Sequence, residues 1–251
     1  MTNKPTDNIF VTELALHHND RTFFKGGLCI SRLSLKNLEA AQINFLHPNE
    51  QAFLNTLQHS RRQHSYLLGR YCAKKALAIY DNRKHSTEIY ITNGVFQQPI
   101  VNSSMHDNPQ VSISHTTTMG AALVFPEAHP MAIDIETIDQ EKRSTILTQL
   151  TKHELELIYS VSNTLPLQLL WTIKEAVSKV LKCGLTIPFE LLEVELLVQQ
   201  GNLFLSYFKN FPQYKVTSFL LSDTICSIVY PRKTLLNIDF TGIKERWLYH
   251  N

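Results

Sequence analysis

The chain has 251 residues, of which 43% are hydrophobic and 18% are charged. This composition is ordinary for a globular protein with a core, and the length allows one large domain or two of about 125 residues. The 24 basic and 22 acidic residues give a net charge of +2, a balance that does not indicate a nucleic-acid binder but would not repel an acidic protein partner.

Targeting and redox signals are absent from the sequence. The polar N-terminus has no apolar signal segment, and no uncharged apolar run reaches ~18 residues, so we expect a cytoplasmic protein without a membrane span. The four cysteines are scattered without a CxxC pattern, and we expect them to be mostly buried thiols rather than disulfides or metal ligands. They are Cys29, Cys72, Cys183 and Cys226.

The first half of the chain predicts strands followed by helices. Residues 1–8 are expected to form a short disordered start, and a loop ending in Gly26-Gly27 separates the first two strands. The apolar patterns predict strands over 9–16 and 28–35, helices over 48–57 and from about Tyr66 to Tyr80, and a strand over 88–92.

The second half continues in blocks of one element type. The predicted strands are 111–114 and 121–125, which pair, a third over 131–136, and four more at 192–198, 203–208, 215–221 and 225–230. Helices are predicted over 144–159 and 166–182. Strands and helices in blocks, rather than in strict alternation, are typical of an α+β fold.

The order of elements suggests an internal duplication. We predict two similar α+β halves, 9–128 and 129–251, that form a pseudo-dimer with the active site in the cleft between them. The alternative is a chance likeness between two amphipathic helices. The alignment matches Tyr66, Arg70 and Lys74 with Trp171, Glu175 and Lys179, Glu50 with Glu154, and Cys29 and Ser31 with Asp134 and Glu136.

The predicted helix 166–182 has two different faces. Pro166 and Thr164 are suitable start signals, and Lys182 with Gly184 as the C′ residue would end it. The apolar face is Leu169, Leu170, Ile173, Val177, Val180 and Leu181. The opposite face is Trp171, Glu175, Lys179 and Lys182. An ordinary surface helix with an i,i+4 Glu–Lys pair is the simpler interpretation of this pattern.

Two acidic residues lie in the predicted strand 131–136. Asp134 and Glu136 point to one face of a strand, and carboxylates that converge in this way repel unless a cation or a proton neutralises them. Oxygen ligands at this spacing suit Mg²⁺. A solvated acidic face on an edge strand is the alternative.

Hydroxyl, imidazole and basic groups are candidates for anion binding. Ser114 and His115 end a predicted strand before a Thr-rich turn, and such groups with turn amides can hold a phosphate. A basic cluster on the helix near residue 66 either binds an anion or is a solvated helix face. It comprises Arg61, Arg62, Arg70, Lys74 and Lys75.

Three motifs together are more specific than each alone. SISH at 112–115, IDIE at 133–136 and WTIKEAVSK at 171–179 followed by CGL resemble the 4′-phosphopantetheinyl transferase superfamily. The closest type is the long, duplicated, single-chain kind that activates peptide and polyketide synthetases. The resemblance extends from about Pro48 to Tyr230.

The resemblance implies transfer of 4′-phosphopantetheine from coenzyme A to a serine of an apo acyl, peptidyl or polyketide carrier protein, with release of adenosine 3′,5′-bisphosphate. It implies that Asp134, Glu136 and Glu175 hold Mg²⁺ or Mn²⁺ against the pyrophosphate. Glu175 or a water would take the serine proton, and Lys179 would stabilise the transition-state charge.

Further residues are implied to bind coenzyme A: Ser114, His115, Trp171 and Lys179. The chain departs from the family at Ala132, where glycine is usual, and at Gln98, where a lysine usually contacts phosphate. Arg61, Arg62 or Lys75 would then supply the missing charge.

Two other functions compete with the transferase. One is a non-catalytic module of the same fold that binds coenzyme A or a carrier protein, and the intact acidic residues argue against it. The other is nucleic-acid binding through the basic helix, which would require a steep salt dependence. A monomer is expected, because the duplication already supplies both halves.

Overall fold

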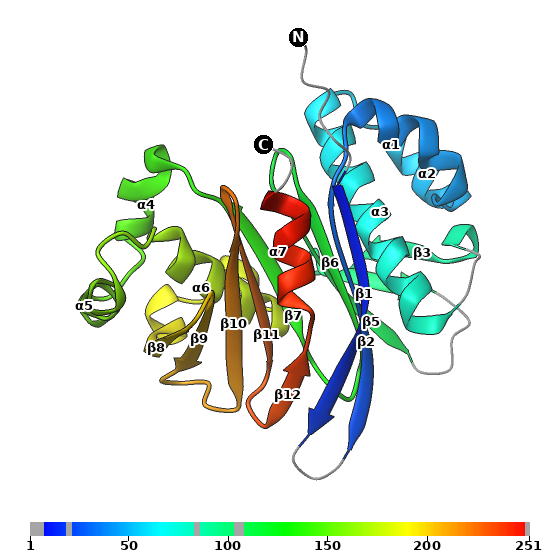
Figure 1. Cartoon of the computed structure of the whole chain (residues 1–251). Coiled ribbons are helices and arrows are strands. Elements are labelled where there is room, and N and C mark those ends of the chain that lie inside the picture. Colours follow the sequence, from blue (N-terminus) through cyan, green and yellow to red (C-terminus); the bar gives the residue numbers. More distant parts are fainter. Residues whose placement is uncertain (1–7, 19–21, 83–85, 103–107, 249–251) are drawn as a thin grey trace. The chain divides into compact units, whose positions relative to one another are not determined.

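The computed structural model describes residues 8–18, 22–82, 86–102 and 108–248 (Figure 1). Most of the predicted N-terminal start lies outside the described residues, and a strand already begins at Asn8. The chain forms two compact units: unit 1 contains the described residues up to His129 and those from Leu235 on, and unit 2 is Pro130–Thr234. Each unit combines helices with antiparallel strands, so the α+β prediction is confirmed.

Unit 1 contains a five-stranded sheet in the order β12-β1-β2-β6-β5 and a separate hairpin, β3-β4. The strands are β1 (Asn8–His18), β2 (Phe23–Arg32), β3 (Tyr90–Asn93), β4 (Pro99–Asn102), β5 (Pro109–His115), β6 (Gly120–Pro126) and β12 (Thr234–Asn237). The helices are α1 (Leu35–Ala41), α2 (Pro48–Leu54), α3 (Ser60–Asp81) and α7 (Phe240–Leu248).

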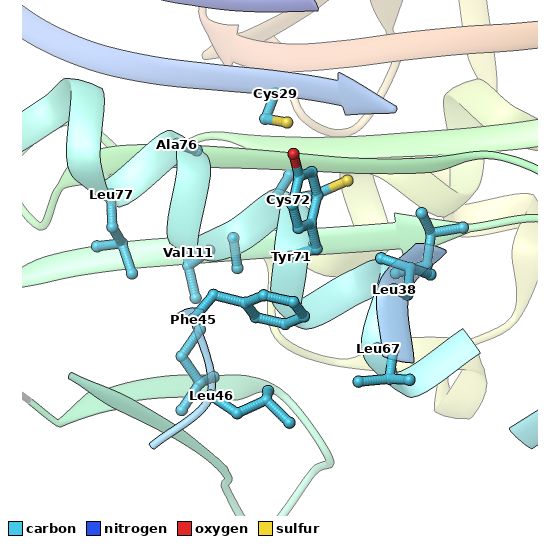
Figure 2. Packing of buried hydrophobic residues seen from close by; sticks show 14 of the residues in the cluster. Cys29, Leu38, Phe45, Leu46, Leu67, Tyr71, Cys72, Ala76, Leu77 and Val111 are labelled. Atoms are coloured by element: carbon cyan, nitrogen blue, oxygen red, sulfur yellow. The ribbon is translucent and has the colours of Figure 1, made fainter. Parts of the chain in front are cut away.

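The core of unit 1 lies between α3 and the sheet. Figure 2 shows Leu67, Tyr71 and Cys72 of α3 in this cluster, together with Cys29 of β2. The helix approaches the sheet so closely that a Cβ at Gly27 would overlap the carbonyl oxygen of Ala76. Gly26 and Gly27 thus lie inside β2 and not in a loop before it. Glycine is required at position 27 because this contact leaves no room for a side chain.

Unit 2 contains a five-stranded sheet in the order β7-β11-β10-β9-β8, with its core between this sheet and the helices. The strands are β7 (Ala132–Thr137), β8 (Val194–Gln200), β9 (Leu203–Phe208), β10 (Tyr214–Leu221) and β11 (Thr224–Pro231). The helices are α4 (Arg143–Leu147), α5 (Lys152–Val161) and α6 (Gln168–Val180). The strand predicted over 131–136 thus belongs to this sheet and not to the β5-β6 pair.

The two units repeat one order of elements: a strand, a set of helices and four further strands, the last of which pairs with that first strand. The pairing register also repeats. Ser31 of β2 lies opposite Gly120 of β6, and Glu136 of β7 lies opposite Ile225 of β11. The distance along the chain from Ser31 to Glu136 is the same as that from Gly120 to Ile225. This agreement confirms the prediction of two similar α+β halves.

A buried carboxylate at the third position of a short helix also repeats. In unit 1, Glu50 of α2 accepts a hydrogen bond from Ile91 N at 2.9 Å and pairs with Lys74 at 2.9 Å. The Glu50 carboxylate also accepts a hydrogen bond from the backbone N–H of the helix-capping residue His47 at 3.0 Å, which completes a capping box, and Arg70 Nε lies 3.5 Å from it.

The same set of contacts surrounds Glu154 of α5 in unit 2. Its carboxylate accepts from Val194 N at 3.0 Å and from Thr151 N at 2.8 Å, and it pairs with Lys174 at 2.9 Å. Lys74 pairs with Glu50 in the way that Lys174 pairs with Glu154, whereas Lys179 pairs with Asp134. In structural role, Lys74 therefore corresponds to Lys174 and not to Lys179. The predicted match of Lys74 with Lys179 is therefore wrong in structural role.

The predicted second half, 129–251, is too long. The boundary near residue 129 agrees with the division into units, but the segment from Leu235 on belongs to unit 1. The reason is that β12 is hydrogen-bonded beside β1, while Ile243 and Trp247 of α7 are buried.

Helix ends differ from the prediction where capping decides them. The predicted helix 144–159 is two helices, α4 and α5, because the Thr151 side chain caps a new helix there. The hydroxyl of Thr164 contacts Ser162 instead of capping α6. After α6, Lys182 already takes a positive φ of 56°, two residues before Gly184.

Other expectations are confirmed. All four cysteines are free thiols, three of them buried and Cys183 half-buried. Among the described residues, no helix is long and apolar enough to cross a membrane.

The buried Glu154–Lys174 pair predicts a large stability effect. Lys174→Met would leave a buried carboxylate without its counter-charge, so we expect unit 2 to lose about 3–5 kcal/mol of unfolding free energy in urea titrations. Lys152→Met removes the same charge from the exposed pair with Glu156 and should change stability by less than about 1 kcal/mol. Equal effects of the two substitutions would contradict this interpretation.

Candidate functional site

The central acidic residues lie on β7. Asp134 and Glu136 share the face of the strand that also carries Ala132, a member of the helix-covered core. Ile133 and Ile135 alternate with them and are fully buried. Register fixes this orientation: β7 pairs with β11, with Asp134 opposite Ser227. The two carboxylates therefore face α6 and not open solvent.

Helix α6 presents the predicted row to this face. Leu169, Leu170, Ile173 and Val177 are completely buried, as the apolar face predicted. Trp171, Glu175 and Lys179 are half-buried, as expected for a row beside the core. Lys182 is exposed and lies beyond the helix end.

Lys179 connects α6 to β7. Its ammonium lies 2.8 Å from Asp134 Oδ1 and donates to the carbonyl oxygen of Ile133 at 3.2 Å. The Asp134 side chain is only 6% exposed, and a charged hydrogen bond at such a site is stronger than one in water. This contact places the helix cation directly on the first strand carboxylate.

Glu175 lies one turn before Lys179 and has an unusual proton affinity. Burial and the negative charge of Asp134 raise the pKa of Glu175 to about 7; Lys179 opposes the rise, and Glu136 adds to it. Among the described residues, no side chain donates a hydrogen bond to this carboxylate. Converging carboxylates of this kind are typical of catalytic sites.

Glu136 has its own counter-charge. Its Oε2 lies 3.2 Å from the ammonium of Lys142, which follows β7 in the chain. The Lys142 side chain is 54% exposed and that of Glu136 25% exposed. The contact between Lys142 and Glu136 has no sequence signal, because the five residues between them include an irregular turn.

The donor set fits a hard divalent cation in its chemistry. Burial and the negative charges of Asp134 and Glu136 raise the pKa of Glu175. A cation would stabilise the three carboxylates, and Mg²⁺ prefers carboxylate and water oxygens. In the part of the chain that the structure describes, however, no three Asp, Glu, His or Cys side chains are close enough to form a metal-binding group. Lys179 and Lys142 occupy two of the carboxylates instead.

Trp171 is the first residue of the row on α6 that continues with Glu175 and Lys179. Its ring stacks on Phe189, with centroids 5.0 Å apart and an angle of 19° between the planes.

Lys174 lies on the buried side of the same helix and was not among the predicted site residues. Lys174 lies between Ile173 and Glu175 in the sequence. These neighbours do not indicate whether its ion pair is buried or on the surface.

The candidate phosphate ligands lie in unit 1. Ser114 is buried and His115 is exposed at the end of β5, as predicted. The turn after them is built by the Thr116 hydroxyl, which accepts hydrogen bonds from the N–H groups of Thr118 and Met119 at 3.2 and 3.0 Å. These residues belong to unit 1, whereas the carboxylates belong to unit 2.

The basic residues of α3 divide into two groups. Arg61, Arg62 and Lys75 are exposed, and Lys75 lies 5.4 Å from the centre of the Tyr71 ring. Arg70 and Lys74 are buried beside Glu50. The interpretation of all five as one solvated or anion-binding face is therefore wrong, because two of them neutralise a core carboxylate.

Gln98 is part of a turn. Its Oε1 accepts a hydrogen bond from Phe96 N at 2.9 Å in the connection between β3 and β4. Gln97 beside it has a positive φ of 62°. Gln98 thus stabilises the local backbone at the position where the family usually has a lysine.

The raised pKa of Glu175 predicts pH-dependent stability. In the folded state the proton is held up to about pH 7, whereas an unfolded glutamate releases it near pH 4.5. Stability is therefore full below the unfolded pKa and is lost as pH rises through about 7. In chelator, Glu175→Gln should raise the unfolding free energy at pH 8 by about 1–3 kcal/mol, reduced by solvent screening of the half-buried group. It should have little effect at pH 4, and an equal gain at both pH values would contradict the repulsion.

Comparisons with known proteins agree with the motif resemblance. The family model described as the 4′-phosphopantetheinyl transferase superfamily matches residues 130–229. This range includes Asp134, Glu136, Glu175 and Lys179. No curated protein matches the chain.

Similar solved structures have low scores. A holo-(acyl-carrier-protein) synthase from Bacillus anthracis in complex with CoA (3′,5′-ADP) is 20% identical, with 45% of this chain and 96% of that chain covered and a TM-score of 0.36. A holo-ACP synthase from Plasmodium yoelii is 16% identical, with 47% and 95% covered and a TM-score of 0.33. The holo-[acyl-carrier-protein] synthase of Thermotoga maritima is 17% identical, with 54% and 74% covered and a TM-score of 0.32. Because these likenesses are weak, the family match carries the assignment. The family match covers residues 130–229, and this segment is similar to the 4′-phosphopantetheinyl transferase superfamily.

Proposed function

We propose that the chain transfers 4′-phosphopantetheine from coenzyme A to a serine hydroxyl of an apo carrier protein. The observation that carries the proposal is the half-buried Glu175, with a pKa of about 7, beside Asp134 and Lys179 within the family-matched segment. The family match supports the reaction class. A carboxylate that is both basic and close to a cationic group supports proton and phosphoryl transfer at this site.

The reaction forms one bond and breaks one. The serine oxygen attacks the pantetheine-side phosphorus of the pyrophosphate, and the bond from that phosphorus to the bridging oxygen breaks. The electron pair leaves with adenosine 3′,5′-bisphosphate, and the serine proton goes to the Glu175 carboxylate. Without the cation, burial and the negative charge of Asp134 raise the pKa of this carboxylate to about 7, so in that state it is a stronger base than an ordinary glutamate.

The metal in this proposal is Mg²⁺, held by Asp134, Glu136 and Glu175. When bound, it would neutralise charge on the phosphates during transfer. Lys179 adds a fixed ammonium, held by Asp134 and by the Ile133 carbonyl oxygen. Such a preorganised charge stabilises a transition state without further reorganisation.

Coenzyme A contacts are proposed for Ser114, His115, Arg61, Arg62 and Lys75 in unit 1, and for Trp171 in unit 2. The exposure of His115, Arg61, Arg62 and Lys75 supports a role in binding an anionic substrate. Arg70 and Lys74 are excluded from this set, because they neutralise Glu50.

A non-catalytic module that binds coenzyme A remains the second candidate. Gln98 favours it, since the residue serves the turn and supplies no positive charge. The raised pKa of Glu175 favours the enzyme, because a binding module has no need for a basic carboxylate.

The direct test is intact-protein mass spectrometry of an apo carrier protein incubated with the chain, coenzyme A and Mg²⁺. We expect the mass of one phosphopantetheine to be added, and no addition with chelator or with Glu175→Gln. No addition to acyl, peptidyl or polyketide carriers, despite measurable binding of coenzyme A, would favour the module.

Lys179→Ala tests the role of the ammonium. Because Lys179 is expected to stabilise charge mainly in the transition state, the variant should lower kcat by about 10²–10³ with a smaller change in KM for coenzyme A. Steady-state kinetics at saturating carrier protein give both values. An effect on KM alone would assign Lys179 to ground-state binding.

A further inference from the structure

The inference concerns Lys142, which neither the family motifs nor the proposed mechanism assigns. Its ammonium lies 3.2 Å from Glu136 Oε2, one of the three carboxylates proposed to hold the metal. The inference therefore rests on the proposed function. Unlike Lys179, Lys142 does not come from α6; it ends a short 3₁₀ helix, Gln140–Lys142, directly after β7.

The turn that carries Lys142 is fixed at several points. Ile138 N donates to the carbonyl oxygen of Asp223 at 2.7 Å, which ties the turn to the β10–β11 connection. Asp139 Oδ1 accepts from Glu141 N at 2.9 Å and starts the 3₁₀ helix. Gln168 of α6 donates its side-chain N–H to the carbonyl oxygen of Asp139. The backbone thus holds Lys142 within reach of Glu136.

The charges at the site show what this contact does. Two ammonium groups neutralise two carboxylates, Lys179 on Asp134 and Lys142 on Glu136. A divalent cation held by the Glu136 carboxylate would lie near the Lys142 ammonium, which already contacts that carboxylate. Like charges that lie close together repel, so the ammonium and the metal would compete.

Of the two lysines, Lys142 is the one that can be displaced from its carboxylate, because it is the more exposed. Its side chain is 54% exposed, whereas that of Lys179 is 29% exposed and also contacts a backbone carbonyl. A lysine on an exposed stem can turn into water at low cost. We propose that Lys142 is an internal competitor for the metal: it occupies Glu136 without the cation, leaves when the cation binds, and thereby weakens the cation affinity of the site.

The test measures metal binding and not activity. Mn²⁺ serves as the probe, and its free concentration is followed by electron paramagnetic resonance with the full-length chain, without coenzyme A or carrier. Lys142→Met removes the charge and keeps most of the side-chain length. We expect this variant to bind Mn²⁺ about two- to fivefold more tightly than the wild type at low salt, with the difference shrinking at high salt.

Two controls separate the contact from net charge and from folding. Lys152→Met removes the same charge from unit 2 at the exposed pair with Glu156, and it should leave the Mn²⁺ affinity unchanged. Lys142→Arg keeps a cation beside Glu136 and should bind Mn²⁺ like the wild type. Circular dichroism confirms that the variants are folded.

The possible outcomes are distinguishable. Equal Mn²⁺ affinity of the wild type and Lys142→Met would overturn the competitor role and leave the proposed metal site intact. An equal gain for Lys152→Met would reduce the effect to net charge and would also overturn the role. If the wild type and all variants failed to bind Mn²⁺, the metal part of the proposed function would be refuted together with this inference.

Discussion

The carboxylate of Glu154 connects the parts of unit 2 on which the candidate site depends. One oxygen accepts the N–H of Val194 at the start of β8, and the other contacts Lys174 of α6 and the N–H of Thr151. Helix α5, strand β8 and helix α6 therefore meet at one buried charge. Because Lys174 immediately precedes Glu175 in α6, this contact sets the position from which Glu175 faces β7. The same arrangement around Glu50 and Lys74 in unit 1 shows that the contact is a property of the repeated fold.

The two units differ at the positions of the candidate site. Cys29 and Ser31 of β2 are small and buried where β7 has Asp134 and Glu136. The repeat thus preserves a buried carboxylate in both halves, and the pair of Asp134 and Glu136 is found on β7 but not on β2. Burial and the negative charge of Asp134 raise the pKa of Glu175 on the facing helix α6. Lys179 and Lys142 offset part of the negative charge on β7.

Much of the fold could be predicted from periodicity alone. The alternation in 203–208 and the long apolar face of α6 each reflect burial on one side, so pattern and structure agree. Predictions failed where a tertiary contact decided the outcome. Gly27 looked like a turn residue, but it is required by the approach of α3 to β2. The C-terminal strand β12 is short, and its place beside β1 depends on pairing across most of the chain.

The site could be predicted where residues are close in sequence or share a motif. Asp134 and Glu136 follow from strand alternation, and Glu175 and Lys179 follow from helix spacing. Lys142 and Lys174 could not be found in this way, because their roles depend on a turn and on a partner in another helix. For the same reason, the sequence grouped Lys74 with anion-binding candidates, although it neutralises Glu50.

The most direct test of the central claim, that the carboxylates of β7 and α6 converge on one cation site, is the pKa of Glu175 itself. Chain labelled with ¹³C at the glutamate side-chain carboxyl can be titrated by NMR in chelator, with Glu175→Gln to assign the signal. The account predicts a midpoint near 7, which should fall in Asp134→Asn and fall further when Mg²⁺ is added to the wild type. A midpoint near 4.5, or one that responds to neither Asp134→Asn nor Mg²⁺, would contradict it.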